Sequence, residues 1–326
     1  MEEKTMKYDV TALGELLVDF TENELSAQGN PLFEANPGGA PCNVLAMLQK
    51  LGAKTAFIGK VGNDALGHML KGKAAAQGID MSGLFLDDKV HTTLAFVHKL
   101  ANGDRDFSFY RNPGADMKLN VEEVRAKADM IANSKAFHFG TLSMTDEGVE
   151  AATKEAVSIA KDAGCLISFD PNYRAPLWSS KEKAKEKMRY GLSVCDVLKI
   201  SDNEVEFLTG KSDIVQGVRE LIDEYGISLV FATAGPDGSY AFYKDLQLFQ
   251  PAFLNENTIE TTGAGDTFMA VALYYAVKYG TKGLNRDILT EALRTASLAA
   301  SLITTRKGAL AVMPDLEEIE KYGKER

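Results

Sequence analysis

Short apolar segments and longer amphipathic segments alternate along most of this chain of 326 residues. Strands that alternate with helices form βαβ units, in which a helix joins two parallel strands. The sequence therefore predicts an α/β fold. From the hydrophobic periodicity we expect strands at residues 8–13, 16–20, 54–60, 136–139, 165–169, 197–200 and 229–233, and helices at residues 43–51, 64–77, 147–163, 181–191, 202–209, 213–225, 265–279 and 286–304.

One stretch departs from this alternation. Residues 91–100 alternate between larger and smaller side chains with a period of two, and residues 106–111 resume the same pattern. The sequence Asn-Gly-Asp at residues 102–104 is a good turn between them. A hairpin without helices is therefore predicted inside an α/β chain, and it is typical of a lid or a small separate sheet.

Composition limits the classes of function. The formal net charge of −10 argues against non-specific binding to nucleic acid or to anionic membranes. The first ten residues hold no apolar signal segment, and the longest apolar run, residues 268–277, is too short to span a bilayer. The three cysteines form no C-x-x-C pair, which is typical of reduced thiols. We therefore expect a cytoplasmic protein of one large domain or two domains.

The segment Thr-Thr-Gly-Ala-Gly-Asp at residues 261–266 carries the chemistry, and an apolar helical run follows it. Two glycines allow a tight turn, so several backbone N–H groups can point at one anion at a helix start. A carboxylate beside a bound phosphate, here Asp266, suits a base that deprotonates an attacking hydroxyl. The alternative is a glycine turn in which Asp266 caps the helix.

Two segments near the N-terminus suit a polyol. Residues 37–43, Pro-Gly-Gly-Ala-Pro-Cys-Asn, could bring backbone close to hydroxyls, with Asn43 donating and accepting hydrogen bonds. Asp19, expected at the end of an early strand, would accept from two adjacent hydroxyls. The alternatives are a flexible loop with Asn43 as a helix cap, and a turn carboxylate at Asp19.

Further candidates follow predicted strands. Asn203 and Glu206 are spaced i, i+3 and suit Mg²⁺, unless Asn203 only caps a helix and Glu206 lies in solvent. Arg174, in Asp-Pro-Asn-Tyr-Arg, could neutralise a phosphoryl group or lie on a surface turn. Residues 233–238, Thr-Ala-Gly-Pro-Asp-Gly, could be a simple turn or hold a nucleotide against backbone.

Two common nucleotide motifs are not supported. Gly210-Lys211-Ser212 approaches a Walker A loop, but Val205 stands where that loop needs glycine. Gly263-x-Gly265 could begin a dinucleotide fingerprint, but Phe268 stands at the third glycine position.

Together these segments resemble the PfkB, or ribokinase-like, family of carbohydrate kinases, and within it the fructokinases. The similarity runs from residues 14–15 to residues 308–309, and its most specific segments are residues 38–67 and 261–268. The first reads Gly-Gly-Ala-Pro-x-Asn and then Gly-x-Val-Gly-x-Asp-x-x-Gly. The resemblance implies one domain over residues 1–326, with a three-layer αβα core around a mainly parallel sheet. It also implies a small β-sheet lid from about residues 16–36 and 90–112.

The resemblance also implies site residues for ATP-dependent phosphorylation of a sugar hydroxyl. For catalysis these are Asp266 as the base, the anion hole of Gly263, Ala264 and Gly265, and Arg174. For the sugar they are Asp19, Gly38, Gly39, Asn43, Arg111, Arg174 and Asp266. For the nucleotide they are Lys199, Ser201, Thr233, Gly235, Gly238, Gly265 and Ser297. For metals they are Asn203 and Glu206, holding Mg²⁺ through water, and Glu260 and Thr262 at a potassium site.

Two positions depart from the family pattern. Many members have Asp where this chain has Glu260, beside the monovalent-cation site, so potassium is a candidate rather than a required ion. Some members have Asn near the adenine where this chain has Ser297.

The preferred hypothesis is a fructokinase that forms fructose 6-phosphate, because residues 112–116 and 261–262 look more like fructokinases than ketodeoxygluconate kinases. The alternatives are a kinase for 2-keto-3-deoxygluconate, ribose or a nucleoside, and a non-catalytic sugar or nucleotide sensor. An acidic sugar needs positive charge in the site, and Arg111 and Arg174 could supply it, so an acidic sugar remains an alternative substrate. Lids of this fold sometimes pair, so a homodimer through the lid is a further expectation.

Overall fold

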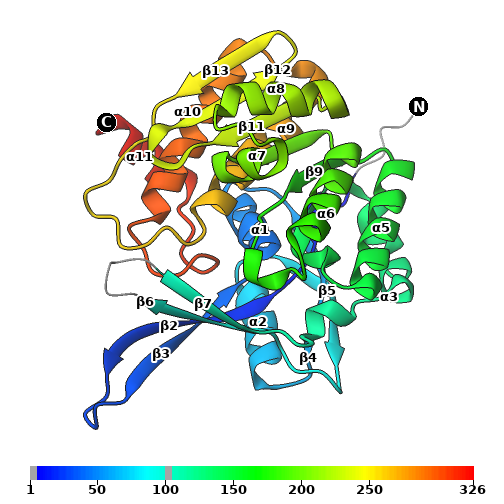
Figure 1. Ribbon diagram of the computed structural model, residues 1–326, viewed down its shortest axis with the longest axis vertical. Helices are drawn as coiled ribbons and strands as arrows, with labels where there is room; N and C mark the ends of the chain where they lie inside the picture. The colour runs from blue at the N-terminus through cyan, green and yellow to red at the C-terminus, as the bar shows by residue number, and fades with distance from the viewer. Residues whose placement is uncertain (1–5, 100–104) are drawn as a thin grey trace.

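The computed structural model describes residues 6–99 and 105–326. Within these residues, one nine-stranded sheet runs through the molecule in the order β13-β12-β11-β10-β9-β8-β1-β4-β5 (Figure 1). The seven neighbouring strands β11, β10, β9, β8, β1, β4 and β5 are parallel. Strands β12 and β13 form an antiparallel hairpin at the β11 edge. The strands are β1 (Tyr8–Leu13), β4 (Thr55–Gly62), β5 (Asp80–Asp87), β8 (Ser134–Gly140), β9 (Leu166–Asp170), β10 (Val197–Ser201), β11 (Leu229–Thr233), β12 (Ser239–Tyr243) and β13 (Leu246–Gln250).

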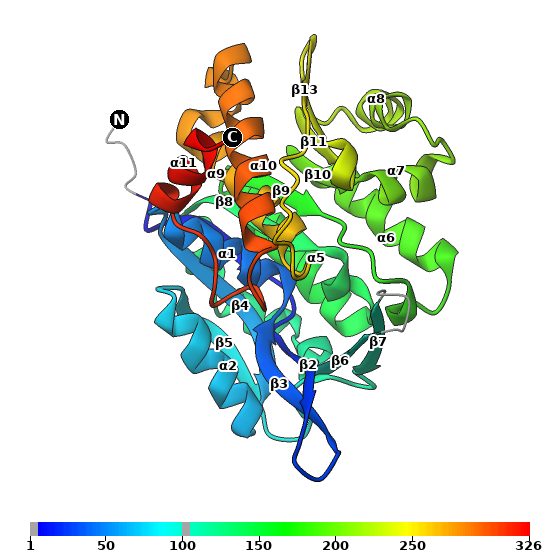
Figure 2. The ribbon, with the colours of Figure 1, turned by 90° about the vertical axis from the view of Figure 1, so that its left-hand side faces the viewer.

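Helices cover both faces of this sheet, as Figure 2 shows edge-on. One apolar cluster joins the sheet to α1 (Ala40–Lys50), α2 (Ala65–Ala76), α9 (Ala264–Gly283), α10 (Arg286–Ile303) and α11 (Leu316–Lys324). A second joins it to α3 (Val121–Arg125), α4 (Ala128–Ala132), α5 (Glu147–Asp162), α6 (Lys181–Val194), α7 (Asp202–Thr209) and α8 (Ile214–Tyr225). The predicted three-layer αβα core is confirmed. Because both faces are covered, the central strands are mostly apolar, and every residue of β4 is buried.

The second sheet is the lid. Its order is β3-β2-β6-β7, with β2 (Leu17–Leu25), β3 (Pro31–Gly38), β6 (Leu94–Lys99) and β7 (Arg105–Tyr110). Strands β2 and β6 are parallel, and the other two pairs are antiparallel. It projects beside one end of the core sheet (Figure 1). The predicted small β-sheet is therefore confirmed, and the predicted turn at residues 102–104 lies outside the described residues.

Several elements differ from the sequence prediction. Strand β2 continues to Leu25 because it pairs along its length with β3, which was not predicted. Strand β3 is mostly half-exposed and holds Pro37, so its sequence lacks an apolar signal. Strand β5 and the helices α3, α4 and α11 were also missed. Helix α1 begins at Ala40, three residues before the predicted start.

Two expectations from composition can be compared with the structure. In the described part of the chain, no helix is long and apolar enough to cross a membrane. The three cysteines, Cys42, Cys165 and Cys195, are buried.

The functional end of the sheet follows from its strand order. β1 and β8 are neighbours in space, so chain connections leave this point in opposite directions. Open α/β sheets bind ligands at the carboxyl ends of the strands at such a reversal. Here the carboxyl ends of β1, β8 and β9 lead to Glu15, Gly140 and Asp170, which line one small cavity with Asp266 from α9.

Candidate active site

The glycine-rich loop forms the start of helix α9. Gly263 has a left-handed φ of 78°, and a Cβ there would lie 2.6 Å from the Ala309 side chain, so the turn requires glycine. Among the described residues, no side chain caps this helix start. Asp266 lies in the first turn and turns away from the cap position, so the capped-turn alternative is wrong. The Ala264 N–H donates to the Thr261 carbonyl at 3.2 Å. The other N–H groups at this helix start suit an anion, because a first turn lacks intrahelical acceptors.

Asp266 is held by a residue from the other end of the chain. Asn43 donates a hydrogen bond from Nδ2 to Asp266 Oδ2 at 2.8 Å, across 223 positions in sequence. Asn43 lies inside α1, whose N-cap is Gly39, so the interpretation of Asn43 as a helix cap is wrong. Burial raises the pKa of Asp266, while Asn43, Lys199 and Arg174 oppose that rise. A raised pKa brings a carboxylate closer to the operating pH of a general base.

The lid contributes Asp19, which lies near the start of β2 rather than at the end of a strand. A Cβ on Gly38 would collide with the Asp19 carboxylate, so the two segments approach each other closely. Burial raises the pKa of Asp19 to about 7, Arg174 lowers it, and Asp266 and Glu260 raise it. The charges of Arg174 and Asp266 therefore act on Asp19.

Arg174 reaches this space from the end of β9. Asn172 takes a left-handed φ of 46°, a conformation that Asn tolerates better than most residues, and turns the chain there. The next backbone N–H, that of Tyr173, donates to Glu204 Oε1 at 2.8 Å. Arg174 is exposed, and its positive charge lowers the pKa of both Asp19 and Asp266 against the larger effect of burial. The alternative of a surface arginine unrelated to the site is not supported.

Arg111 has a different position. Its side chain is 2% exposed and pairs with Asp116, with Nε donating to Oδ2 at 2.8 Å. Nη1 donates to Thr145 Oγ1 at 2.8 Å, and Nη2 donates to the Leu142 carbonyl at 2.9 Å. Within the described residues, the structure does not bring this guanidinium together with Asp19 and Asp266. Its partners give it an architectural role, and its predicted sugar contact gains no support.

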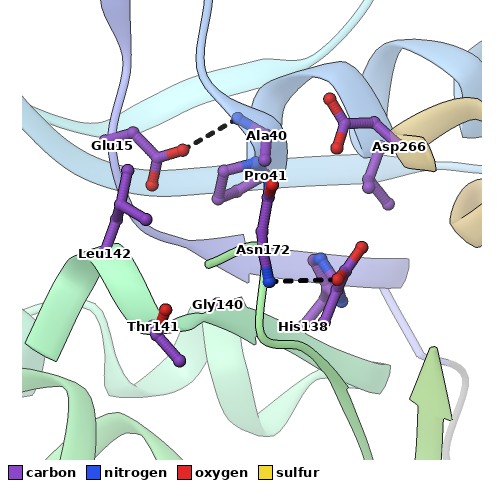
Figure 3. A pocket seen from close by; sticks show the side chains of 11 residues that line it. Glu15, Ala40, Pro41, His138, Gly140, Thr141, Leu142, Asn172 and Asp266 are labelled. Carbon is purple, nitrogen blue, oxygen red and sulfur yellow. Dashed lines mark hydrogen bonds between the residues drawn. The ribbon is translucent and has the colours of Figure 1, made fainter. Parts of the chain in front are cut away.

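A cavity of about 10 Å³ lies beneath the site, large enough for about one water molecule (Figure 3). Three carboxyl groups line it, from Glu15, Asp170 and Asp266. Glu15 Oε1 accepts from the Ala40 backbone N–H at 2.8 Å, as the figure shows, and so holds the start of α1. Burial raises the pKa of Glu15 and of Asp170 to about 7 in each case.

Sequence reasoning assigned no role to Glu15, Asp170 or Glu204. Asp170 pairs with Lys199, whose Nζ lies 3.1 Å from Oδ2. A Cβ on Gly265 would lie 3.2 Å from the same Nζ, so Lys199 supports the anion loop from below. The signals were weak: Glu15 follows the Gly14 that begins the family resemblance, and Glu204 completes a Ser-x-x-Glu capping box.

A second cavity, of about 430 Å³, begins at the anion loop and extends between the β11–β12 turn and α10. Apolar side chains such as Phe253, Leu254 and Phe268 form part of its wall, which suits a flat aromatic base. Gly235 and Gly238 both have positive φ, so this turn also presents bare backbone. The predicted nucleotide residues that line the cavity are Thr233, Gly235, Gly238, Gly265 and Ser297.

Two predicted nucleotide residues lie elsewhere. Lys199 is buried against Asp170, below the loop. Ser201 is the N-cap of α7, and its hydroxyl donates to Glu204 Oε2 at 2.9 Å. The side chain of Ser297 lines the cavity and lies 3.1 Å from the Ser239 hydroxyl.

The predicted Mg²⁺ residues, Asn203 and Glu206, are exposed on the first two turns of α7. Because Ser201 caps this helix, the interpretation of Asn203 as the cap is wrong. In the described ranges, no three His, Cys, Asp or Glu side chains gather closely enough to hold a metal ion. An exposed amide and carboxylate fit a cation that keeps its waters and also binds phosphate.

The predicted monovalent-cation residues lie just before the anion loop. Glu260 is buried, and its Oε1 accepts from the Gly308 N–H at 2.7 Å. The Glu260 N–H donates to the Thr304 carbonyl at 3.1 Å. The carboxylate therefore holds the segment after α10, and Thr262 follows it half-buried.

Known proteins resemble this chain over nearly its whole length. The sequence profile of the pfkB family carbohydrate kinases matches residues 7–316. Fructokinase-2 of Solanum lycopersicum is 39% identical over 311 residues, which cover 95% of this chain and 94% of that protein. A probable fructokinase-2 of Arabidopsis thaliana is 37% identical over 307 residues, which cover 94% and 92%.

Solved structures agree in fold. The crystal structure of fructokinase with bound ATP from Xylella fastidiosa superposes with a TM-score of 0.88 at 28% identity, covering 98% of this chain and 99% of that one. A fructokinase double mutant from Vibrio cholerae O395, bound to fructose, ADP and potassium, superposes with a TM-score of 0.86 at 27% identity, covering 98% and 99%.

Proposed function

This chain belongs to the pfkB family of carbohydrate kinases, and from that premise we propose that it is a fructokinase, converting D-fructose and ATP to D-fructose 6-phosphate and ADP. One observation carries the proposal: Asp266 stands in the first turn of α9 behind the glycine loop and accepts a hydrogen bond from Asn43, and the charge of Arg174 opposes the rise of its pKa. The named relatives, from plants and bacteria, are fructokinases. Phosphoryl transfer needs this combination of a base, a cation and an anion hole.

We infer a role for each residue. Asn43 occupies Asp266 Oδ2, which leaves Oδ1 to accept the proton of the sugar's primary hydroxyl. The hydroxyl oxygen then bonds to the γ-phosphorus as the bond to the β–γ bridging oxygen breaks, and ADP leaves. The N–H groups of Gly263, Gly265 and Asp266 and the Arg174 guanidinium stabilise the charge that develops on the transferred group. Asp19 orients the sugar by accepting hydrogen bonds from its hydroxyls.

ATP would lie with its base in the 430 Å³ cavity and its phosphates over the Gly265 end of the loop. Asn203 and Glu206 would hold Mg²⁺ through its waters, and when bound this ion neutralises phosphate charge. Potassium is a further proposal at residues 260–262, where Glu260 could offer its backbone carbonyl. Comparing the rate in K⁺ with that in tetramethylammonium at equal ionic strength tests it.

The two arginines favour a neutral sugar. An acidic sugar such as 2-keto-3-deoxygluconate needs a cation near its carboxylate, and the sequence offered Arg111 and Arg174 for this. Arg111 is neutralised by Asp116 in the protein interior. Arg174 already faces two carboxylates, Asp19 and Asp266, and the phosphoryl group requires it.

A sugar panel tests the proposal. ADP release would be measured by a coupled assay with D-fructose, 2-keto-3-deoxygluconate, D-ribose and a nucleoside, each with ATP and Mg²⁺. We expect kcat/KM to be highest for D-fructose, and Asp266→Asn serves as the inactive control that still folds. A clearly higher kcat/KM for another sugar would show that this sugar, and not fructose, is the substrate. ATP binding without release of ADP for any sugar would instead favour a sensor.

Two predictions from the sequence remain predictions. They are a cytoplasmic location and a homodimer that pairs through the lid. Size-exclusion chromatography with light scattering measures the second directly.

A further inference from the structure

Two neighbouring threonines stand where the chain leaves the core and enters lid strand β6. Thr92 is 4% exposed and Thr93 is 1% exposed. The Thr92 hydroxyl donates to Asp64 Oδ1 at 2.8 Å, and its N–H donates to Asp64 Oδ2 at 2.9 Å. Asp64 also caps α2 by accepting from the Gly67 N–H at 2.8 Å. One core carboxylate thus fixes both the start of α2 and the approach to the lid.

Thr93 is fixed by a second carboxylate. Its hydroxyl donates to Asp116 Oδ1 at 2.5 Å, and Asp116 is buried in its pair with Arg111. Arg111 follows the end of β7, and its other donors reach Thr145 and the Leu142 carbonyl of the core. Asp116 therefore joins the entry and the exit of the β6–β7 hairpin. We call residues 91–93 and 111–116 the lid root.

Glycines make this close packing possible. A Cβ on Gly62 would lie 2.6 Å from the Thr92 nitrogen, and a Cβ on Gly67 would collide with the Gly62 carbonyl. A Cβ on Gly114 would collide with the Thr93 hydroxyl. These contacts give a physical role to the Gly-x-Val-Gly-x-Asp-x-x-Gly segment at residues 59–67, which the phosphoryl-transfer chemistry leaves unexplained.

The lid root is directly connected to the sugar side of the site. The Thr93 carbonyl accepts from the Val18 N–H at 3.1 Å, and Asp19 is the next residue of β2. Strand β2 continues in parallel register with β6, pairing Asp19 with Ala95. A shift of Thr93 would therefore move Asp19. The residues that line the nucleotide cavity all lie between positions 233 and 304, so none of them belongs to the lid root.

We propose that Asp64 and Asp116 are positioning residues that clamp Thr92 and Thr93 and thereby place Asp19 over the sugar. The proposal rests on the sugar-binding role given to Asp19 above. Neither carboxylate touches substrate. The clamp should affect the binding of sugar but not of ATP, because it acts on the lid and leaves the nucleotide cavity of the core unchanged.

The test removes the two hydroxyls and keeps both carboxylates. In the variant with Thr92→Val and Thr93→Val, we expect the KM for sugar to rise roughly tenfold, since two hydrogen bonds to charged groups are lost. The KM for ATP should stay within about twofold of the wild-type value. The conservative variant with Thr92→Ser and Thr93→Ser keeps the hydroxyls and should restore the KM for sugar.

A matched control removes two buried threonine hydroxyls far from the lid. Thr11 and Thr55 are buried on core strands, and each makes side-chain hydrogen bonds. Thr11→Val with Thr55→Val should leave the ratio of the two KM values unchanged. If the lid-root variant raised both KM values together, or matched this control, the clamp would have no positioning role.

Hydrogen exchange gives a readout that does not depend on which sugar is accepted. Amides of residues 17–25 should exchange faster in the lid-root variant, while those of residues 264–283 should keep their wild-type rates. Unchanged exchange in β2 would overturn the proposal. If the panel replaces fructose by another sugar, the KM comparison uses that sugar, so the two proposals fail separately.

Discussion

The nucleotide side and the sugar side of this site are built in different ways. The nucleotide cavity is lined by the β11–β12 turn, the loop before α9, the start of α9 and the end of α10, all of which belong to the core. The sugar side brings together Asp19 from the lid, Asn43 from α1, Arg174 after β9 and Asp266 from α9. A cavity built from the core alone is fixed by the packing of the core, whereas a site that includes a lid residue also depends on how the lid and the core dock.

The two sides also differ in charge. Among the described residues that line the nucleotide cavity, none is ionisable near neutral pH. The sugar side holds Glu15, Asp19 and Asp170, and burial raises the pKa of each to about 7. Changes that affect the sugar side should therefore alter chemistry and pH dependence, and changes on the nucleotide side should alter the KM for ATP.

The largest effect is expected at the base. Asp266→Ala should lower kcat by about 10²–10⁴-fold, because the attacking hydroxyl loses its proton acceptor. The KM for ATP should change little, since the cavity proposed to hold the adenine ring is intact. Steady-state kinetics with both substrates varied measures this. Turnover near the wild-type value would mean that another group accepts the proton.

Substitution of the two arginines should have different effects, on kcat for Arg174 and on the free energy of unfolding for Arg111. Arg174→Ala should lower kcat by about 10²–10³-fold, the typical cost of removing one group that stabilises transition-state charge, with little change in stability. Arg111→Ala leaves Asp116 buried without its cation and should lower the free energy of unfolding by about 3–5 kcal/mol. Urea denaturation and kinetics on both variants check this contrast. The reverse pattern would return Arg111 to the sugar site.

A smaller effect is expected at the contact that orients the base. Asn43→Ala removes the hydrogen bond to Asp266 and should lower kcat roughly tenfold, as expected for a hydrogen bond to a charged group. Asn43→Asp would place a second carboxylate beside the base and should be worse than alanine. Equal activity of wild type and Asn43→Ala would show that α9 alone orients Asp266.

The nucleotide side should respond only in the KM for ATP. Gly238 has a φ of 117°, and a Cβ there would collide with the Gln250 carbonyl, so Gly238→Ala strains this turn. We expect the KM for ATP to rise about threefold to tenfold and the KM for sugar to stay constant. Gly210→Ala is a suitable control, because Gly210 also has a positive φ but has open space around it. A rise in the KM for sugar would show that the two sides are coupled.

The smallest effect concerns stability against pH. Asp19 has a folded pKa of about 7, above its unfolded value near 3.9. Between those values the folded protein binds more protons, so this group makes the free energy of unfolding fall as pH rises from 4 to 7. Relative to Asp19→Asn, the free energy of unfolding of wild type should fall by on the order of 1 kcal/mol between pH 5 and pH 8, because solvent screens the half-buried side chain. Urea denaturation at both pH values measures the difference, and parallel curves would contradict the raised pKa.

The parts of the structure that depend on local signals could be predicted from sequence. Glycine placement and apolar periodicity indicated the α9 loop, the β11–β12 turn and the alternation of strands and helices. The spacing of Asn203 and Glu206 placed both on the exposed side of α7. These features need no knowledge of what packs against them.

The parts that depend on tertiary partners could not be predicted. Arg111 was expected at the sugar from the family resemblance, but Asp116, five residues later, pairs with it inside the protein. Lys199 was expected at the nucleotide, yet it lies against Asp170 from the neighbouring strand. The tertiary fold decides which of several carboxylates pairs with a given cation. The sequence pattern does not contain that information.

The hydrogen bond between Asn43 and Asp266 has a consequence for synthesis of the protein. The two residues are 223 positions apart, so at about 5–20 residues per second the ribosome adds the second roughly 10–45 s after the first. Until then, the nascent chain has its lid strands but neither its base nor the completed cavity for ATP. An unfinished chain therefore cannot hydrolyse the cell's ATP, and the enzyme becomes active only when translation is nearly complete.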